Sequence, residues 1–280
     1  MFLTFIQEFS NMLLWTLCAF IFLGTSFLSL WVRRDPKIWG TLLGLSLLSG
    51  LVAGNMNWIG LIFIIVLLLL WVFYDRRPNV ALFIFIICVS ASLKMRFLPG
   101  YTPFFFTPKF AVGLEGSLMG LFPLAFLVPL ARGMKDWAAV MKGLVIGCAG
   151  IAILAVLATF SGATHWHFEP PTFAAARTLS NFFLTSMPEE GFYRGLIQNT
   201  FCKYFENIRL GKILALISTS VLFTAAHVYW SPGLQILVFV FLASLLYGGV
   251  YLISGKIESS IFCHFLLNFI HMTFFSYHAM

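Results

Sequence analysis

The chain has 280 residues, of which 60% are hydrophobic and only 10% are charged, and its formal net charge is +7. This composition excludes a soluble globular domain and predicts a polytopic membrane protein surrounded by membrane lipid. Because the basic residues lie in short clusters between apolar runs, the positive charge indicates membrane topology and not nucleic acid binding.

Apolar runs predict about ten helices, so the expected fold is an all-α, polytopic transmembrane helical bundle. The expected spans are 11–32, 38–54, 57–74, 79–93, 117–131, 139–160, 173–200, 211–229, 235–254 and 258–276. The five cysteines occur singly, without a CxxC pair, which predicts neither a disulfide framework nor a zinc knuckle.

Basic clusters follow every second span, and if the spans alternate in direction these clusters share one side of the membrane. The clusters are Arg33, Arg34 and Lys37; Arg76 and Arg77; Arg132, Lys135 and Lys142; Lys203, Arg209 and Lys212; and Lys256. Basic residues favour the cytoplasmic side, so both termini are expected outside the cytoplasm. Lys94, Arg96 and Lys109 fall on the outer side, in a stretch rich in Pro and Phe that we expect to be interfacial or re-entrant.

The segment 161–172 combines helix breakers with aromatic residues and predicts a linker. It divides the chain into N-terminal scaffold helices, residues 1–160, and a C-terminal core, residues 161–280, in which polar side chains recur at membrane depth. His165 and His167 in the linker fit either an aromatic-belt feature or a pair of metal ligands.

The expected span 173–200 carries three ionisable side chains, Glu189, Glu190 and Arg194. Charge inside a membrane is costly, so such groups either pair or take part in chemistry. Glu190 and Arg194 are four residues apart, in the order that favours an ion pair. Glu189 projects about 100° away around the helix and can meet a group on another helix. The sequence therefore predicts a structural ion pair and, beside it, a candidate base.

Two later spans carry pairs at i to i+4 spacing, Phe223 with His227 and His264 with Asn268. With Glu189 they supply the groups that amide hydrolysis requires: a base for water, imidazoles that orient the water or protonate the leaving amine, and a carboxamide donor for the oxyanion. Structural roles stay open, with His227 as a satisfied core histidine and His264 with Asn268 as a pair that bridges helices.

Three further polar residues lie near the outer ends of these spans. His271 shares a face with His264 and favours a structural role. Arg177 and Asn181, near the start of the Glu189 helix, are expected to cap the helix or to reach the interface.

These motifs, in this order on successive or near-successive helices, resemble those of the CPBP family, also called the Abi or CAAX-protease and bacteriocin-processing family. This family includes the type II CAAX prenyl endopeptidases. The residues that carry the resemblance are Glu189, Glu190, Arg194, Phe223, His227, His264 and Asn268. It covers roughly residues 175–275 and implies an all-helical intramembrane protease whose catalytic core is the last four helices.

The resemblance also implies roles for single residues: Glu189 as general base, His227 and His264 around the attacking water, and Asn268 as oxyanion donor. Glu190, Arg194 and Phe223 have supporting roles. Family members are often called metalloproteases, while related endopeptidases have been described as glutamate-dependent. The expected cofactor is therefore either none or a divalent metal such as zinc, with Glu189, His227 and His264 as candidate ligands.

The leading hypothesis is an intramembrane endopeptidase acting on a membrane-anchored or lipidated peptide or protein, prenylated substrates included. An immunity or binding protein that keeps the polar core without hydrolysis is the first alternative. A transporter that uses Glu189 and the histidines as a proton relay is the second. Other intramembrane proteases fit less well. An aspartyl type needs a GxGD motif, which the chain lacks, and a rhomboid-like type needs a GxS serine with a histidine two helices later, whereas the chain has no histidine before His165.

Overall fold

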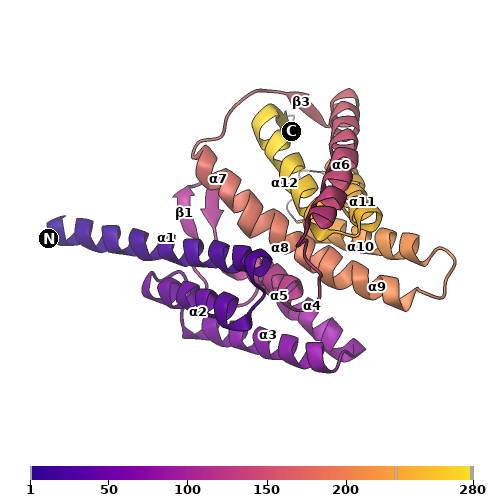
Figure 1. Cartoon of the computed structure of the whole chain (residues 1–280). Helices are drawn as coiled ribbons and strands as arrows, with labels where there is room; N and C mark the ends of the chain where they lie inside the picture. The colour runs from indigo at the N-terminus through magenta and orange to yellow at the C-terminus, as the bar shows by residue number, and fades with distance from the viewer. Residues whose placement is uncertain (1, 230, 232, 278–280) are drawn as a thin grey trace. The chain divides into compact units, whose positions relative to one another are not determined.

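A computed structural model of the chain describes residues 2–229, 231 and 233–277. If the continuous run from Ala174 to Tyr204 is counted as one helix, these residues form ten helices, accompanied by short two-stranded sheets (Figure 1). The prediction of an all-α helical fold is confirmed. The chain divides into two compact units, residues 1–127 with 183–188 and residues 128–182 with 189–280.

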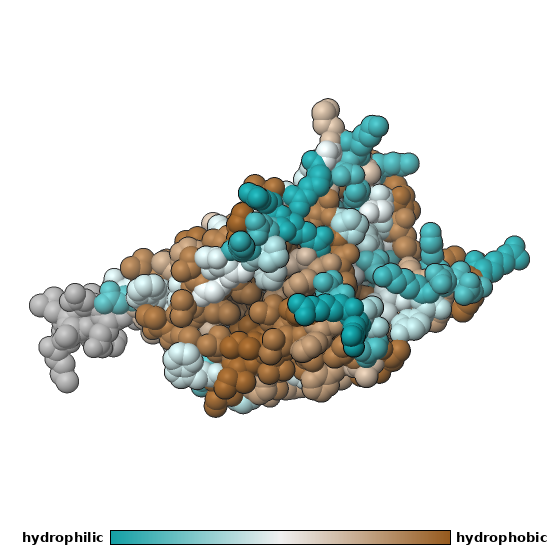
Figure 2. All heavy atoms as spheres, turned by 60° about the horizontal axis from the view of Figure 1, so that its bottom comes forward, coloured by the Kyte–Doolittle hydropathy of each residue, from teal (hydrophilic) through white to brown (hydrophobic). Residues whose placement is uncertain are grey.

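Among the residues that the structure describes, four helices are long and apolar enough to cross a membrane. They are α1 over Ser10–Val32, α3 (Trp58–Arg76), α6 (Met134–Phe160) and α11 (Leu234–Ser254). Many large apolar side chains on these helices are exposed, and hydrophobic residues cover much of the surface drawn in Figure 2. Exposed apolar surface of this extent suits contact with lipid, as expected for an integral membrane protein.

The first unit begins with four helices, and the starts of the last three follow directly from the sequence, whereas the first begins at Phe2 and not at the predicted residue 11. They are α1 (Phe2–Val32), α2 (Pro36–Val52), α3 and α4 (Val80–Lys94). The last three each follow a polar N-cap, Asp35, Asn57 or Asn79, whose side chain accepts a hydrogen bond from a backbone N–H of the first turn. These caps fix where each helix begins, within a few residues of the predicted starts.

Aromatic rings form much of the first unit's core. Trp71 is fully buried, and its ring stacks on that of Phe126 with 6.3 Å between centroids. Trp39 meets Phe126 edge-on at 5.8 Å. Phe126 is the last residue of α5 (Leu118–Phe126), so α2, α3 and α5 converge on this ring.

Helix α5 is shorter than the expected span 117–131, because it ends at Phe126. Pro129 cannot continue a helix, and a residue before proline is driven toward extended backbone. Residues 128–132 accordingly have no regular structure. At 9 residues, α5 is too short to cross a bilayer.

The stretch expected to be interfacial or re-entrant contains a β-hairpin. Strand β1 (Phe104–Thr107) pairs antiparallel with β2 (Phe110–Val112). The preceding loop passes very close to α3. Gly100 has φ +100, and a Cβ added there would lie 2.4 Å from the backbone nitrogen of Gly60. Only glycine fits this position, and the neighbouring Tyr101 hydroxyl donates to the Gly60 carbonyl over 2.6 Å.

Helix α6 belongs to the second unit, although the sequence placed it among the N-terminal scaffold helices. It packs on α11 and α12 (Ile257–Phe274) through glycines. A Cβ added at Gly143 would lie 2.6 Å from Ser259 Oγ, and one added at Gly147 would lie 2.8 Å from Cys263 Sγ. Small residues at four-residue spacing let membrane helices approach this closely.

The run from Ala174 to Tyr204 is one continuous helix with changing hydrogen-bond pattern. It comprises α7 (Ala174–Ser180), the π-helical η2 (Asn181–Ser186), α8 (Met187–Glu190), the π-helical η3 (Gly191–Gln198) and α9 (Asn199–Tyr204). Pro188 lies within it and cannot donate to a preceding carbonyl. A locally widened helix accommodates such a residue, and π turns of this kind are frequent at functional sites.

The linker 161–172 is held by the end of α12. Strand β3 (Thr164–Trp166) pairs antiparallel with β4 (Phe275–Tyr277), with His165 opposite Ser276. His165 Nε2 lies 2.7 Å from the Ser276 hydroxyl, while His167 Nε2 lies 3.2 Å from the exposed Glu169 carboxylate. The two histidines of the HxH pair therefore contact different partners.

Candidate active site

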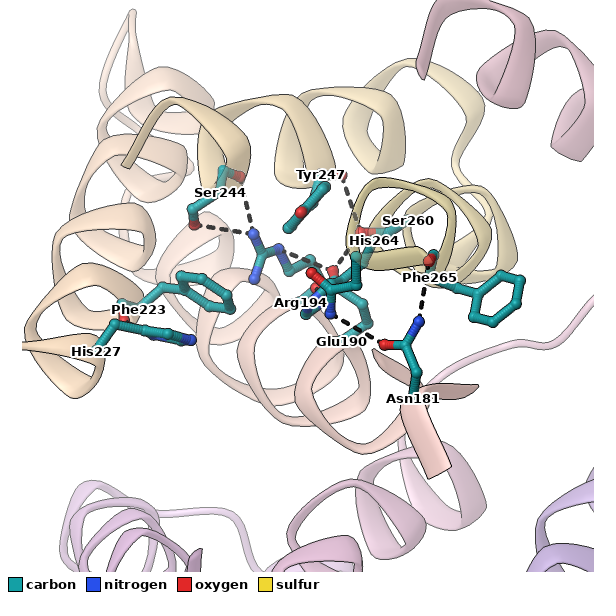
Figure 3. Close-up of polar contacts among 11 residues, drawn as sticks. Asn181, Glu190, Arg194, Phe223, His227, Ser244, Tyr247, Ser260, His264 and Phe265 are labelled. Carbon is teal, nitrogen blue, oxygen red and sulfur yellow. Dashed lines mark hydrogen bonds and ion pairs between the residues drawn. The ribbon is translucent and has the colours of Figure 1, made fainter. Parts of the chain in front are cut away.

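Polar and aromatic side chains from four helical segments of the second unit meet in one group, in which every residue except the half-buried His227 is buried. The composite helix contributes Glu190 and Arg194, α10 (Gly211–His227) contributes Phe223 and His227, α11 contributes Ser244 and Tyr247, and α12 contributes Ser260 and His264 (Figure 3). The sequence predicted five of these eight residues.

Glu190 is the centre of the group and is fully buried. Its Oε2 lies 3.1 Å from Arg194 Nε, which confirms the predicted ion pair. Its Oε1 lies 2.7 Å from His264 Nδ1, and it also accepts a hydrogen bond from the Ser260 hydroxyl. A buried carboxylate is costly unless it is paired and hydrogen-bonded, and Glu190 meets both conditions.

Arg194 is also fully buried and joins the composite helix to α11. Its Nη2 donates to the Ser244 carbonyl over 2.8 Å and lies 2.9 Å from the Ser244 hydroxyl. The guanidinium carbon lies 5.0 Å from the ring centroid of Phe223 and 5.5 Å from that of Tyr247. These contacts surround the charge with an anion, a carbonyl dipole and two aromatic rings, which suits a buried arginine.

His264 lies between Glu190 and the ring of Tyr247. Its imidazole stacks on Tyr247 with 4.5 Å between centroids and an interplanar angle of 11°. A carboxylate accepts hydrogen bonds, so the bond to Glu190 places a proton on Nδ1, and Nε2 is the nitrogen that accepts whenever the ring carries one proton. The sequence suggested His264 as a group near the attacking water but did not identify Glu190 as the residue that orients it.

His227 is the last residue of α10 and contacts the site through Phe223. Its Nδ1 lies 2.7 Å from the Phe223 carbonyl oxygen, which only accepts, so Nδ1 carries the proton and Nε2 is the acceptor. The Phe223 and His227 rings stack with 4.4 Å between centroids, as the i to i+4 spacing predicted. Phe223 also meets His264 edge-on at 5.9 Å and thus lies between the two imidazoles.

Asn268 lies one turn beyond His264 on α12 and is bound to the composite helix. Its Nδ2 donates to Asn181 Oδ1 over 3.1 Å, and Asn181 Nδ2 donates to the Phe265 carbonyl over 3.1 Å. Asn181 was expected to cap its helix or reach the interface, but its side chain is only 8% exposed and faces α12. The sequence signal for this contact is an asparagine within a predicted membrane span, since such residues form hydrogen bonds between helices.

Glu189 precedes Glu190 in α8 and is likewise buried, with 5% of its surface exposed. Both acids are therefore buried, and the catalytic role of Glu189 stays a prediction. The described residues contain no cluster of three or more His, Cys, Asp or Glu side chains that could hold a metal ion. Glu189, His227 and His264 thus do not form a preassembled metal site in this conformation.

Residues 170–270 match the family model described as type II CAAX prenyl endopeptidase Rce1-like. This range contains all three motifs, so the resemblance to CAAX proteases drawn from the sequence is confirmed. No curated protein and no solved structure matches the chain.

Proposed function

From the match of residues 170–270 to the CAAX prenyl endopeptidases, we propose that the protein is an intramembrane endopeptidase. Its substrate would be a membrane-anchored or lipidated peptide, cleaved by water that Glu189 activates. The observation that carries this proposal is the buried group around Glu190. In this group Glu190 binds Arg194 and His264 inside the protein, and the adjacent acid Glu189 is buried as well.

The proposed reaction uses groups of the chain alone. Glu189 takes a proton from water as the water oxygen bonds to the carbonyl carbon of the scissile amide. The carbonyl oxygen becomes an oxyanion and accepts a hydrogen bond from the Asn268 carboxamide. The C–N bond then breaks, and the leaving nitrogen receives the proton held by Glu189, which yields a carboxylic acid and an amine and restores the Glu189 carboxylate.

The histidines would orient the water. His264 has its Nδ1 proton bound to Glu190, so Nε2 can accept a hydrogen bond from water. His227 has its Nδ1 proton bound to the Phe223 carbonyl and offers Nε2 in the same way. Glu190 and Arg194 would serve this site by positioning, since each has its polar contacts within the protein.

Replacing Glu189 with Gln tests the proposed base. We expect hydrolysis of a fluorogenic peptide with a farnesylated cysteine, measured in proteoliposomes, to fall by about 10²–10⁴-fold, because glutamine cannot accept the proton. Glu206→Gln is the matched control, since Glu206 is exposed and lies beyond α9, and it should leave turnover unchanged. The same peptide without the lipid tests whether substrate must be membrane-anchored.

Full turnover by the Glu189→Gln variant would remove the base and with it this mechanism. If the parent protein cleaves neither peptide and its biological effect survives Glu189→Gln, the result favours the binding or immunity hypothesis. Proton-coupled uptake into vesicles that is lost in Glu189→Gln would instead favour the transporter.

A further inference from the structure

The Asn181 side chain forms hydrogen bonds with two residues of helix α12. Asn181 begins the π-helical stretch η2, and its carboxamide donates to the main-chain carbonyl of Phe265 and accepts from the carboxamide of Asn268, both over 3.1 Å. Figure 3 shows the Asn181 side chain directed at α12, with the bond to Phe265. The two contact points are three residues apart on one helix, so the Asn181 side chain has little freedom to rotate.

The Phe265 carbonyl determines which way both carboxamides face. A carbonyl oxygen only accepts hydrogen bonds, so Asn181 must direct its NH₂ group to Phe265 and its oxygen to Asn268. The Asn181 oxygen also only accepts, so Asn268 must direct its own NH₂ group to Asn181. One N–H of Asn268 is used in this bond, and the second N–H of that group is left for another acceptor.

This orientation matters for an oxyanion. An N–H donor stabilises negative charge on the scissile carbonyl oxygen, whereas an amide oxygen in the same place would repel it. Without Asn181, the Asn268 carboxamide can rotate by half a turn and present either group.

We infer that Asn181 is a positioning residue, which holds the Asn268 carboxamide so that its NH₂ group is the one presented to substrate. The inference rests on the proposed function, in which Asn268 contacts the oxyanion and Asn181 acts only through Asn268. A purely structural role, in which Asn181 merely joins its helix to α12, predicts different kinetics.

A double-mutant cycle separates the two roles. The Asn181→Ala, Asn268→Ala and doubly substituted proteins are compared with the parent for kcat and KM on the farnesylated peptide. We expect Asn268→Ala to lower kcat by about 10²–10³-fold and Asn181→Ala to lower it by about 10–10²-fold with KM unchanged. The double variant should match Asn268→Ala, because no donor is left to orient.

The matched control is Asn199→Ala. Asn199 lies in the same composite helix and also joins it to a neighbouring helix, since its Oδ1 accepts from the Tyr251 hydroxyl over 3.0 Å. This contact is outside the group around Glu190, so kcat should stay at the parent value. If Asn181→Ala does not fold, Asn181→Ser replaces it, because a serine hydroxyl is too short to reach both partners and should show the same loss of kcat.

Three results would overturn the inference. The first is a kcat for Asn181→Ala equal to that of Asn199→Ala while Asn268→Ala is impaired; the proposed function would then survive. The second is losses that multiply in the double variant, which would mean that Asn181 acts independently of Asn268. The third is full activity of Asn268→Ala, which would remove the oxyanion donor from the proposed function as well.

Discussion

A single carboxylate, Glu190, binds Arg194 within its own composite helix and connects that helix to α12 through Ser260 and His264. Because its carboxylate is bound to arginine, serine and histidine, Glu190 is suited to holding the site in place. In our proposal the general base is the adjacent acid, Glu189.

Removing the Glu190 carboxylate should lower the stability of the core. In Glu190→Ala, Arg194 would remain buried without its counter-ion, and breaking a buried pair in this way typically costs about 3–5 kcal/mol. We expect the free energy of unfolding in detergent to fall by about that amount. Replacing both partners, as Glu190→Gln with Arg194→Met, should recover much of the loss, because no lone charge is left. Equal stability of Glu190→Ala and the parent would contradict the ion-pair interpretation.

Contacts within one helix were predictable from the sequence, and contacts between helices were not. Glu190 with Arg194 and Phe223 with His227 follow from four-residue spacing. The bond between His264 and Glu190 depends on how α12 packs against the composite helix, which spacing within either helix does not specify.

At the scale of elements, the helix that carries both acids is the least regular one in the described residues. A helix over 173–200 was predicted, and the structure has one from Ala174 to Tyr204, but with π-helical stretches on both sides of α8. The α-helical value of about 100° per residue therefore applies within α7, α8 and α9 but not within η2 and η3. The π turns were not predictable, because they reflect both Pro188 and packing against neighbouring helices.

Glycines set how closely α6 approaches its neighbours. A Cβ at Gly143 would lie 2.8 Å from the Cβ of Ser259, a contact that no side-chain rotation relieves. We expect Gly143→Ala to lower the free energy of unfolding by about 1–3 kcal/mol, measured by denaturant or heat in detergent.

Gly249 in α11 provides the control for this prediction. An added Cβ there meets nothing within 4 Å, so Gly249→Ala should raise stability by about 0.5–1 kcal/mol through helix propensity. If both substitutions changed the free energy of unfolding in the same direction, close packing of α6 would not be what determines the stability change at Gly143.

At the scale of the whole molecule, the sequence predicted a division after residue 160, whereas the compact units place α6 with the C-terminal helices. Hydropathy alone could not reveal this, because α6 carries no mid-membrane charge and its role lies in close packing. The predicted number of helices agrees with the structure, since long apolar runs bounded by polar caps leave few alternatives.

The orientation in the membrane stays a prediction and can be tested by labelling. In a variant without the five native cysteines, we expect a single cysteine at Lys109 to react with an impermeant maleimide added outside intact cells. A single cysteine at Arg209 should react only after lysis, because basic clusters favour the cytoplasmic side. Both positions are exposed. The opposite pattern of labelling would reverse the assigned topology.

The pairing of β3 with β4 has a consequence for biosynthesis. Strand β3 leaves the ribosome before the composite helix, and β4 leaves it after α12. The two strands can meet only when every helix that contributes to the group around Glu190 has been translated. Their pairing is therefore a late event in assembly, and a nascent chain arrested before residue 275 would lack it.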